Sequence, residues 1–238
     1  MYKLIIIFIL VTVVLLTGCD QFPLTGSGNV VTQEEAIFDF DKVDISHSFE
    51  VDIKQGENFS VIIRVDDNLV EHLQVEKFGS TLRIGLKDSR AFIINNATME
   101  AEVTMPELIG LDISGASRAT ITGFKSTEEL ILDISGSSSL RGDIESGDAS
   151  LNLSGSSDAN LIGSAGNLTL DASGSSDVDL SDFPVADAKI DASGASTVTV
   201  NASGRLDVDA SGASDVYYLG NPTMGTIETS GASSVETK

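Results

Sequence analysis

The stretch Ile190-Asp191-Ala192-Ser193-Gly194-Ala195-Ser196 is one of seven copies of a short pattern, and the spacing of these copies decides the fold. Each copy has an apolar residue three places before a Ser-Gly-(Ala/Ser)-Ser turn, and successive turns are 18 to 21 residues apart. A near-constant step of this length predicts a stacked repeat. The glycines of the seven turns are Gly115, Gly136, Gly155, Gly174, Gly194, Gly212 and Gly231.

Apolar and polar residues alternate on both sides of every turn, which is the periodicity of β-strands and not of helices. One unit is therefore two short strands that meet at a bend. The units lack the motif and the helix of a leucine-rich repeat, the length of a WD40 or kelch blade, and the Gly-Gly-x-Gly-x-Asp signature of a calcium-binding roll. We therefore expect an all-β fold: a single-stranded, right-handed parallel β-helix (solenoid) with about seven regular coils of 18–21 residues.

Equivalent positions should then stack in columns along the rod. One inward column is predicted to contain Ile113, Ile134, Leu153, Ala172, Ala192, Ala210 and Thr229. Glycine suits a bend that needs a positive φ or lacks room for a Cβ. We expect the neighbouring serines to form hydroxyl ladders that satisfy one another and the backbone of the turn.

The N-terminus predicts the location of the protein. A short basic start and an apolar run from Leu4 to Leu16 have the form of a secretory signal and are short for a membrane span. The end of the run, Leu16-Thr17-Gly18-Cys19, resembles a bacterial lipobox, and this resemblance implies that Cys19 is lipidated after removal of residues 1–18. We therefore expect an extracytoplasmic protein of the bacterial cell envelope, anchored to a membrane through Cys19. Residues 19–35 are polar and rich in Gly, so we interpret them as the lipidated Cys and a flexible tether.

The folded domain is predicted to span residues 36–238. Residues 36–107 alternate on a pitch of about ten residues and form a less regular β region, interpreted as wider coils that cap the N-terminal end of the rod. Residues 108–238 contain the regular Ser-Gly-x-Ser coils. With 14 basic and 36 acidic residues the net charge is −22, so the surface repels phosphate backbones and nucleic acid is not expected as a partner.

The repeat also predicts a column of acidic side chains on the outer surface. Carboxylates about 4.8 Å apart on successive coils repel one another, and salt screening, raised pKa values or bound divalent cations would relieve that repulsion. Plain solvation is one interpretation, and weak binding of Ca²⁺ or Mg²⁺ is the other. No cofactor besides such a cation is expected. The candidate cation ligands are Asp112, Asp133, Asp171, Asp191 and Asp209.

Several segments outside the repeats resemble one family in their order along the chain. These are Gly26–Val30, Phe40–Ser46, Phe49–Gly56, Val65–Leu69, Thr81–Ile84 and Met105–Leu108 ahead of the first turn. Residues 26–238 are similar to the autotransporter adhesin, head GIN domain family of bacterial envelope proteins. The resemblance implies a β-helical fold and an adhesin-like role, and it supplies no catalytic residues.

Three functions are compatible with these features. The first is a non-catalytic lipoprotein that presents a rigid acidic rod to a glycan or an envelope protein. The second is a structural element that forms homo-oligomers through the open edge of its C-terminal coil. The third is a polysaccharide-active β-helix enzyme, which is disfavoured because catalytic grooves need different residues converging from several coils. We expect no enzyme activity and no catalytic residues.

Overall fold

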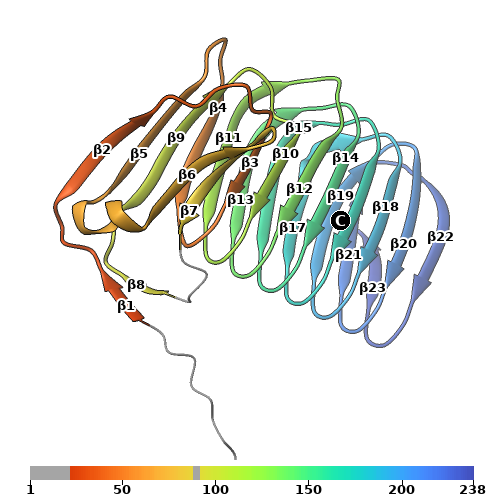
Figure 1. Ribbon diagram of the computed structural model, residues 1–238. Helices are drawn as coiled ribbons and strands as arrows, with labels where there is room; N and C mark the ends of the chain where they lie inside the picture. Colours follow the sequence, from red (N-terminus) through yellow and green to blue (C-terminus); the bar gives the residue numbers. More distant parts are fainter. Residues whose placement is uncertain (1–21, 88–91) are drawn as a thin grey trace, which may run out of the picture.

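The computed structural model describes residues 22–87 and 92–238, and the fold is all-β (Figure 1). Two large sheets contain almost all of the strands, and a short parallel pair, β1 (Phe22–Thr25) and β8 (Phe92–Asn95), stands apart from them. In these residues no helix is long and apolar enough to cross a membrane. The predicted signal peptide (residues 1–18) and Cys19 lie outside the described residues.

The ten-stranded sheet contains the strand of each coil that precedes the Ser-Gly turn. Its order is β22 (Thr223–Thr229), β20 (Arg205–Ala210), β18 (Ala188–Ala192), β16 (Leu168–Ala172), β14 (Ala149–Leu153), β12 (Leu130–Ile134), β10 (Gly110–Ile113), β3 (Lys42–Ile45), β7 (Thr81–Leu86) and β6 (Leu73–Phe78).

The eleven-stranded sheet contains the strand of each coil that follows the turn. Its order is β2 (Val30–Glu35), β5 (Ser60–Asp66), β9 (Met99–Met105), β4 (Glu50–Gln55), β11 (Arg118–Lys125), β13 (Ser139–Glu145), β15 (Asp158–Ser164), β17 (Asp177–Val185), β19 (Thr197–Ala202), β21 (Asp215–Leu219) and β23 (Ser234–Thr237).

Seven turns of a β-solenoid therefore occupy the region from β10 to β23, which confirms the predicted fold class. Each coil pairs in parallel with the next, and the register aligns equivalent residues. The predicted inward column is present, from Ile113 paired with Ile134 to Ala210 paired with Thr229. Its first six members are buried, and Thr229 on the last coil is exposed.

The Ser-Gly turn is built by glycine conformation and by a buried serine. All seven glycines have φ between +75° and +81°, and a Cβ on Gly136 would collide with the backbone of Gly115 one coil away. The second serine of six turns donates its Oγ hydrogen to the carbonyl of the first serine of the same turn, at 2.8–3.0 Å. The predicted bonding of these serines to the backbone of the turn is therefore confirmed, whereas the hydroxyls of these six turns bond to their own turns and not to one another.

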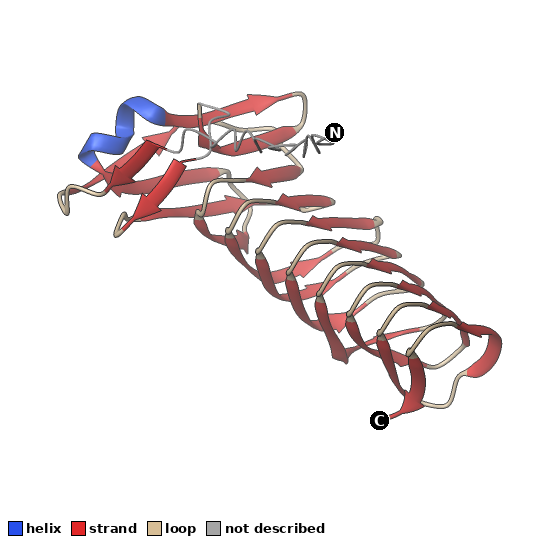
Figure 2. Ribbon diagram, turned by 90° about the horizontal axis from the view of Figure 1, so that it is seen from below, coloured by secondary structure: helices blue, strands red, loops and turns tan. Residues whose placement is uncertain are grey.

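The N-terminal region differs from the expected wider coils because it is a mixed sheet. Strand β5 runs antiparallel to both β2 and β9, and β6 forms an antiparallel hairpin with β7. The coil made by β3 and β4 is inserted between β7/β9 and β10/β11, so spatial order departs from chain order there. A 3₁₀ helix, η1 (Asp67–His72), lies at this end, and the C-terminus lies at the other end (Figure 2).

The predicted tether is shorter than residues 19–35, because the chain joins a sheet well before residue 36. Strand β2 pairs with β5 along its whole length. The loop ahead of β2 is held by two carboxylates: buried Asp66 accepts a hydrogen bond from Gly28 N at 2.8 Å, and Asp67 accepts one from Ser27 Oγ at 2.6 Å. Two segments that carry the family resemblance, Gly26–Asn29 and Val65–Leu69, are thus one interlocked feature.

Candidate functional site

The predicted acidic column lies on the outer face of the ten-stranded sheet. Asp112 pairs with Asp133, and the register continues through Asn152, Asp171, Asp191, Asp209 and Glu228, all of them exposed. At its N-terminal end the column extends to Asp44 and then to Arg83. These two residues were missed because they precede the repeats, and the inserted β3–β4 coil could not be inferred from spacing.

Partial desolvation and mutual repulsion both raise the pKa of two carboxylates of this column, Asp112 and Asp191. The pKa of Asp112 is raised by desolvation first and then by the charges of Asp44 and Asp133. The pKa of Asp191 is raised in the same way, with Asp171 and Asp209 as its charged neighbours. Asn152 interrupts the series and donates a hydrogen bond to Asp133 Oδ1 at 2.8 Å. The repulsion between neighbouring carboxylates is thus relieved in part by the amide of Asn152 and in part by the raised pKa values of Asp112 and Asp191.

The five candidate cation ligands form a row rather than a cage. Within residues 22–87 and 92–238, no three or more His, Cys, Asp or Glu side chains are grouped so that they could hold a metal ion. Calcium takes six to eight oxygen ligands, whereas a row offers only neighbouring carboxylates, so water would have to supply most of the coordination. The arrangement fits weak cation association at most, and that association stays a prediction.

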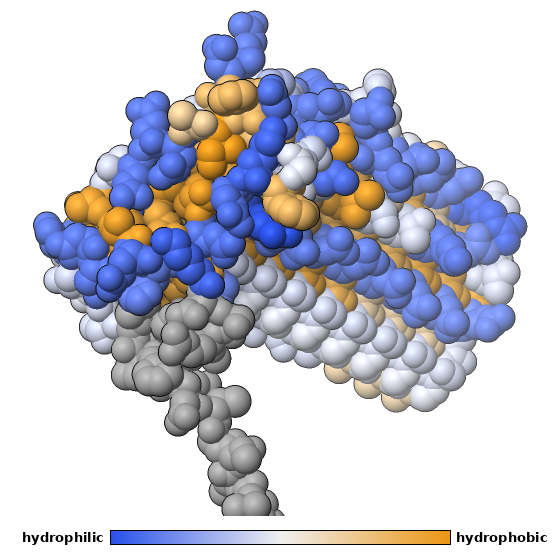
Figure 3. Space-filling model, viewed as in Figure 1, coloured by the Kyte–Doolittle hydropathy of each residue, from blue (hydrophilic) through white to orange (hydrophobic). Residues whose placement is uncertain are grey.

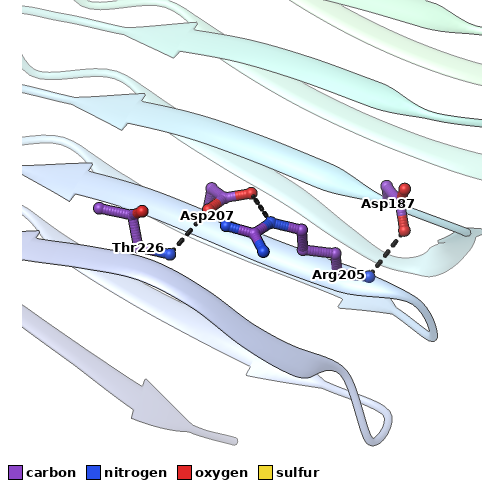
Figure 4. A network of polar contacts seen from close by, with 4 residues as sticks. All are labelled: Asp187, Arg205, Asp207 and Thr226. Atoms are coloured by element: carbon purple, nitrogen blue, oxygen red, sulfur yellow. Dashed lines mark hydrogen bonds and ion pairs between the residues drawn. The ribbon is translucent and has the colours of Figure 1, made fainter.

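A second set of aspartates stabilises the coils through their backbone. Asp187 Oδ1 accepts a hydrogen bond from Arg205 N, and Asp207 Oδ1 accepts one from Thr226 N, each at 2.7 Å and each across one coil (Figure 4). Arg205 also donates from Nε to Asp207 Oδ2 at 2.6 Å. The hydrogen bond from the Arg205 side chain, followed by that from Thr226 N, lowers the pKa of Asp207 to about 2. We assign these residues to the fold and not to a ligand site.

The outer face of the eleven-stranded sheet carries a shallow groove of about 540 Å³ across β11, β13, β15 and β17. Arg118 and Arg141 lie beside aspartates there, so its charge is mixed. Arg118 Nη1 lies 3.6 Å from Glu50 Oε2. Desolvation and the charges of Asp158 and Asp179 raise the pKa of Asp177. The groove is lined by Arg118, Ser139, Leu140, Arg141, Asp158, Ala159, Asn160, Asp177 and Asp179.

The surface of the rod is organised in bands that run along its length. Figure 3 shows a hydrophilic band next to a pale band of residues with intermediate hydropathy. The exposed Gly and Ala or Ser residues of the turns, such as Gly174 and Ser175, have this intermediate character. Such surfaces repeat the same chemistry every coil, which suits contact with an extended partner better than enclosure of a small molecule.

The bend between β3 and β4 has the backbone conformation of the Ser-Gly turns but contains no glycine. His47 lies at this bend in register with Gly115 of the next coil. Its φ is 62°, a left-handed conformation that glycine adopts at the same position in the later coils. Its Nδ1 lies 2.8 Å from Ser46 Oγ and accepts a hydrogen bond from Leu86 N at 3.3 Å. The local signal was absent because this bend contains no glycine.

An all-β rod with regular polar outer faces defines the class of β-solenoid domains. Within that class, the chain belongs to the family described as "Putative auto-transporter adhesin, head GIN domain", whose sequence profile matches residues 39–222. The resemblance inferred from the sequence is therefore confirmed. No curated protein matches the chain.

Solved structures share the fold at low sequence identity. A "putative adhesin" from Bacteroides fragilis NCTC 9343 is 20% identical with a TM-score of 0.84, and the match covers 90% of this chain and 100% of that one. A "putative adhesin" from Parabacteroides merdae ATCC 43184 is 17% identical (TM-score 0.66; 91% and 99% covered). A "putative lipid binding protein" from Parabacteroides distasonis ATCC 8503 is 19% identical (TM-score 0.70; 91% and 99% covered). The names of these neighbours describe adhesins and a binding protein, not enzymes.

Proposed function

We propose that this protein is a non-catalytic binding module of the bacterial cell envelope, anchored through lipidated Cys19, that presents its β-solenoid to a glycan or an envelope protein. The observation that carries this proposal is the alignment of the outer polar column of the ten-stranded sheet over seven coils, which continues past a register shift between β20 and β22. Family membership and the names of the structural neighbours support an extracytoplasmic, adhesin-like role.

The position of the anchor favours presentation of the rod. Strands β1 and β2 lie at the end opposite the C-terminal coils (Figure 1). An anchor at Cys19 is three residues from the start of β1, so a lipid tether would hold the N-terminal end near the membrane and leave the C-terminal coils furthest from it. The faces of the coils would then be accessible to molecules outside the membrane.

Retention of envelope components by the chain starting at Asp20, which contains every described residue, tests this proposal. We expect retention to decrease when Asp133, Asp171 and Asp191 are replaced together by Asn. The matched control replaces Asp158, Asp177 and Asp215, which lie on the outer face of the other sheet, by Asn. Equal retention by all three proteins would argue against the acidic column, and no specific retention by the wild type would contradict the binding role.

A second candidate is self-assembly through the last coil. Among the described residues, β22 pairs only with β20 and β23 pairs only with β21, so each offers a free hydrogen-bonding edge. Unpaired edges pair readily with other strands. Sedimentation of the chain starting at Asp20 tests this alternative, because a monomer at high concentration would contradict it. No observation within the described residues favours the polysaccharide-active enzyme.

A further inference from the structure

The two ends of the rod differ in how their edge strands are arranged. At the C-terminal end one coil supplies both edges, β22 in the ten-stranded sheet and β23 in the eleven-stranded sheet (Figure 1). At the other end two strands, β7 and β6, lie beyond the β3–β4 coil in one sheet, whereas three strands, β9, β5 and β2, lie beyond it in the other. The two C-terminal edges are therefore level with each other, and the two N-terminal edges are staggered.

The N-terminal edge of the ten-stranded sheet is also partly covered. Lys77 of β6 donates hydrogen bonds from Nζ to Phe38 O and Asp39 O, at 3.1 and 3.0 Å, so the loop between β2 and β3 lies against this edge strand. Proteins use loops and lysines in this way to prevent an edge strand from pairing with another chain. In the part of the chain that the structure describes, the backbones of β22 and β23 bond only to the preceding coil.

The hydrophobic core is open at the same C-terminal end. In the coil that contains β20 and β21, four inward side chains are at most 3% exposed. Their partners in the last coil stand in the same columns but are exposed or half-buried. The buried residues are Leu206, Val208, Ala210 and Val216, and their partners are Met224, Ile227, Thr229 and Val235. A partner that continues both sheets would therefore bury apolar side chains as well as pair the free backbone.

The free backbone groups of the last coil belong to its inward residues. Ser230 N and Ser234 N each donate to a carbonyl oxygen of the preceding coil. Successive residues of a strand direct their N–H and C=O groups to opposite sides. The N–H and C=O groups of Ile227, Thr229 and Val235 therefore point away from the rod, towards the open edge.

A second copy of the same last coil is complementary to this end. Strand β22 runs towards the Ser-Gly turn and β23 runs away from it, so a twofold axis along the strands and midway between the sheets pairs β22 of each copy antiparallel with β23 of the other. Both pairs form at once because the two edges are level. When Ile227 faces Val235 of the copy, Glu228 and Glu236 each face a hydroxyl side chain and not another carboxylate, which like charges would disfavour. Such a contact is self-complementary and closes as a dimer.

We propose that the last coil binds the last coil of a second copy that is anchored in a facing membrane. The two N-terminal ends, and with them the two lipid anchors at Cys19, lie at opposite ends of this tail-to-tail dimer. The contact therefore cannot join two upright copies in one membrane, but it can hold two membranes together. This inference rests on the proposed function, since it needs the anchor, and it commits self-assembly through the last coil to one geometry and one partner.

Sedimentation and small-angle X-ray scattering of the chain starting at Asp20, over a concentration series, test the contact. The series is measured in physiological salt, because two strongly acidic copies repel one another at low ionic strength. Each copy contributes strands of 7 and 4 residues, fewer than the roughly 20–30 residues of a standard interface, so we expect a dimer with Kd in the micromolar range. The maximum dimension of the dimer should approach twice that of the monomer. A monomer at every concentration, a dimer no longer than the monomer, or assemblies that keep growing would each overturn the tail-to-tail contact.

Two variants locate the contact on the last coil. Thr229→Pro removes an N–H group that points to the open edge, a position where an edge strand tolerates proline, and should weaken dimerisation at least about tenfold. Val235→Lys places a charge in the shared core and should have the same effect. Ala195→Lys adds the same charge on an exposed turn in the middle of the rod and should leave Kd unchanged. Circular dichroism confirms that each variant is folded, and unchanged dimerisation in both Thr229→Pro and Val235→Lys would overturn the assignment to this coil.

Beads that carry the chain test the role between membranes. Beads coupled through the N-terminal end should cluster with one another, whereas beads coupled through the C-terminal end should not, because the last coil then faces the bead surface. A dimer in solution without clustering of the first beads would overturn contact between membranes. Failure of the dimer leaves the proposed binding role standing, because specific retention of envelope material by the wild type and by Thr229→Pro would still support a binding module that uses the faces of the rod.

Discussion

The close stacking of the turn glycines makes a sharp prediction about stability. Gly174 has φ +81°, and a Cβ at this position would collide with Gly155 O and lie 3.0 Å from Gly155 N. That same carbonyl oxygen accepts the hydrogen bond from Ser175 N at 2.7 Å. Gly123 has nearly the same conformation, φ +78°, but no atom lies within 4 Å of its Cβ position. Alanine at the two sites therefore separates conformational strain from steric collision.

Both substitutions place a Cβ in the left-handed region, which costs about 1–2 kcal/mol. Only Gly174→Ala also forces the coils apart, at about 1–3 kcal/mol for overpacking and about 1 kcal/mol for the strained hydrogen bond. After the gain from a stiffer unfolded chain, we expect Gly123→Ala to lower the free energy of unfolding by about 1 kcal/mol and Gly174→Ala by about 2–5 kcal/mol. The gain from a stiffer unfolded chain is the same in both and cancels in the comparison.

Urea denaturation of the chain starting at Asp20, followed by circular dichroism and by fluorescence of Tyr217 and Tyr218, measures both values. The difference between the two variants is the quantity to compare, because it does not depend on the extrapolation common to them. Equal destabilisation would show that glycine is needed only for its φ angle and would refute the argument from coil contact.

Three further predictions concern polar groups. Ser176→Ala removes the hydrogen bond from a buried hydroxyl to Ser173 O and should cost about 1 kcal/mol, whereas Ser138→Ala should be neutral or stabilising because Ser138 Oγ is buried without a partner; thermal melts of both variants compare them. The raised pKa of Asp112 means that its ionised form disfavours folding, so its contribution to stability should increase as pH falls through the raised pKa towards the ordinary value of 3.8. Asp112→Asn should remove this increase in melts across pH. If cations associate with the acidic column, millimolar Ca²⁺ should raise the melting temperature above that in NaCl of equal ionic strength, and no difference would exclude the association.

The regular part of the fold was predictable because one interaction repeats. A Ser-Gly turn every 18–21 residues requires the same bend each time, so the columns from Ile113 to Thr229 and from Asp112 to Glu228 followed from spacing alone. The acidic column could be identified residue by residue for the same reason. The hydrogen bonds of the turn serines could not be predicted in the same way. Whether a hydroxyl reaches a neighbouring coil or its own turn depends on differences in distance of less than an ångström.

The N-terminal part was less predictable because its pairing is not local. Strand alternation located β4 and β5, but it could not show that β5 turns back antiparallel on β9. The bend at His47 lacks the glycine that marks the other turns.

The insertion of the β3–β4 coil has a consequence for how the chain acquires its structure. Its neighbours on one side, β7 and β9, are formed by residues 81–105, and its neighbours on the other side, β10 and β11, follow still later. A chain that emerges N-terminus first cannot complete this coil until the strands on both sides are available. Contacts between distant segments slow folding, so we expect this closure to be rate-limiting, with the remaining coils adding rapidly as nearest neighbours.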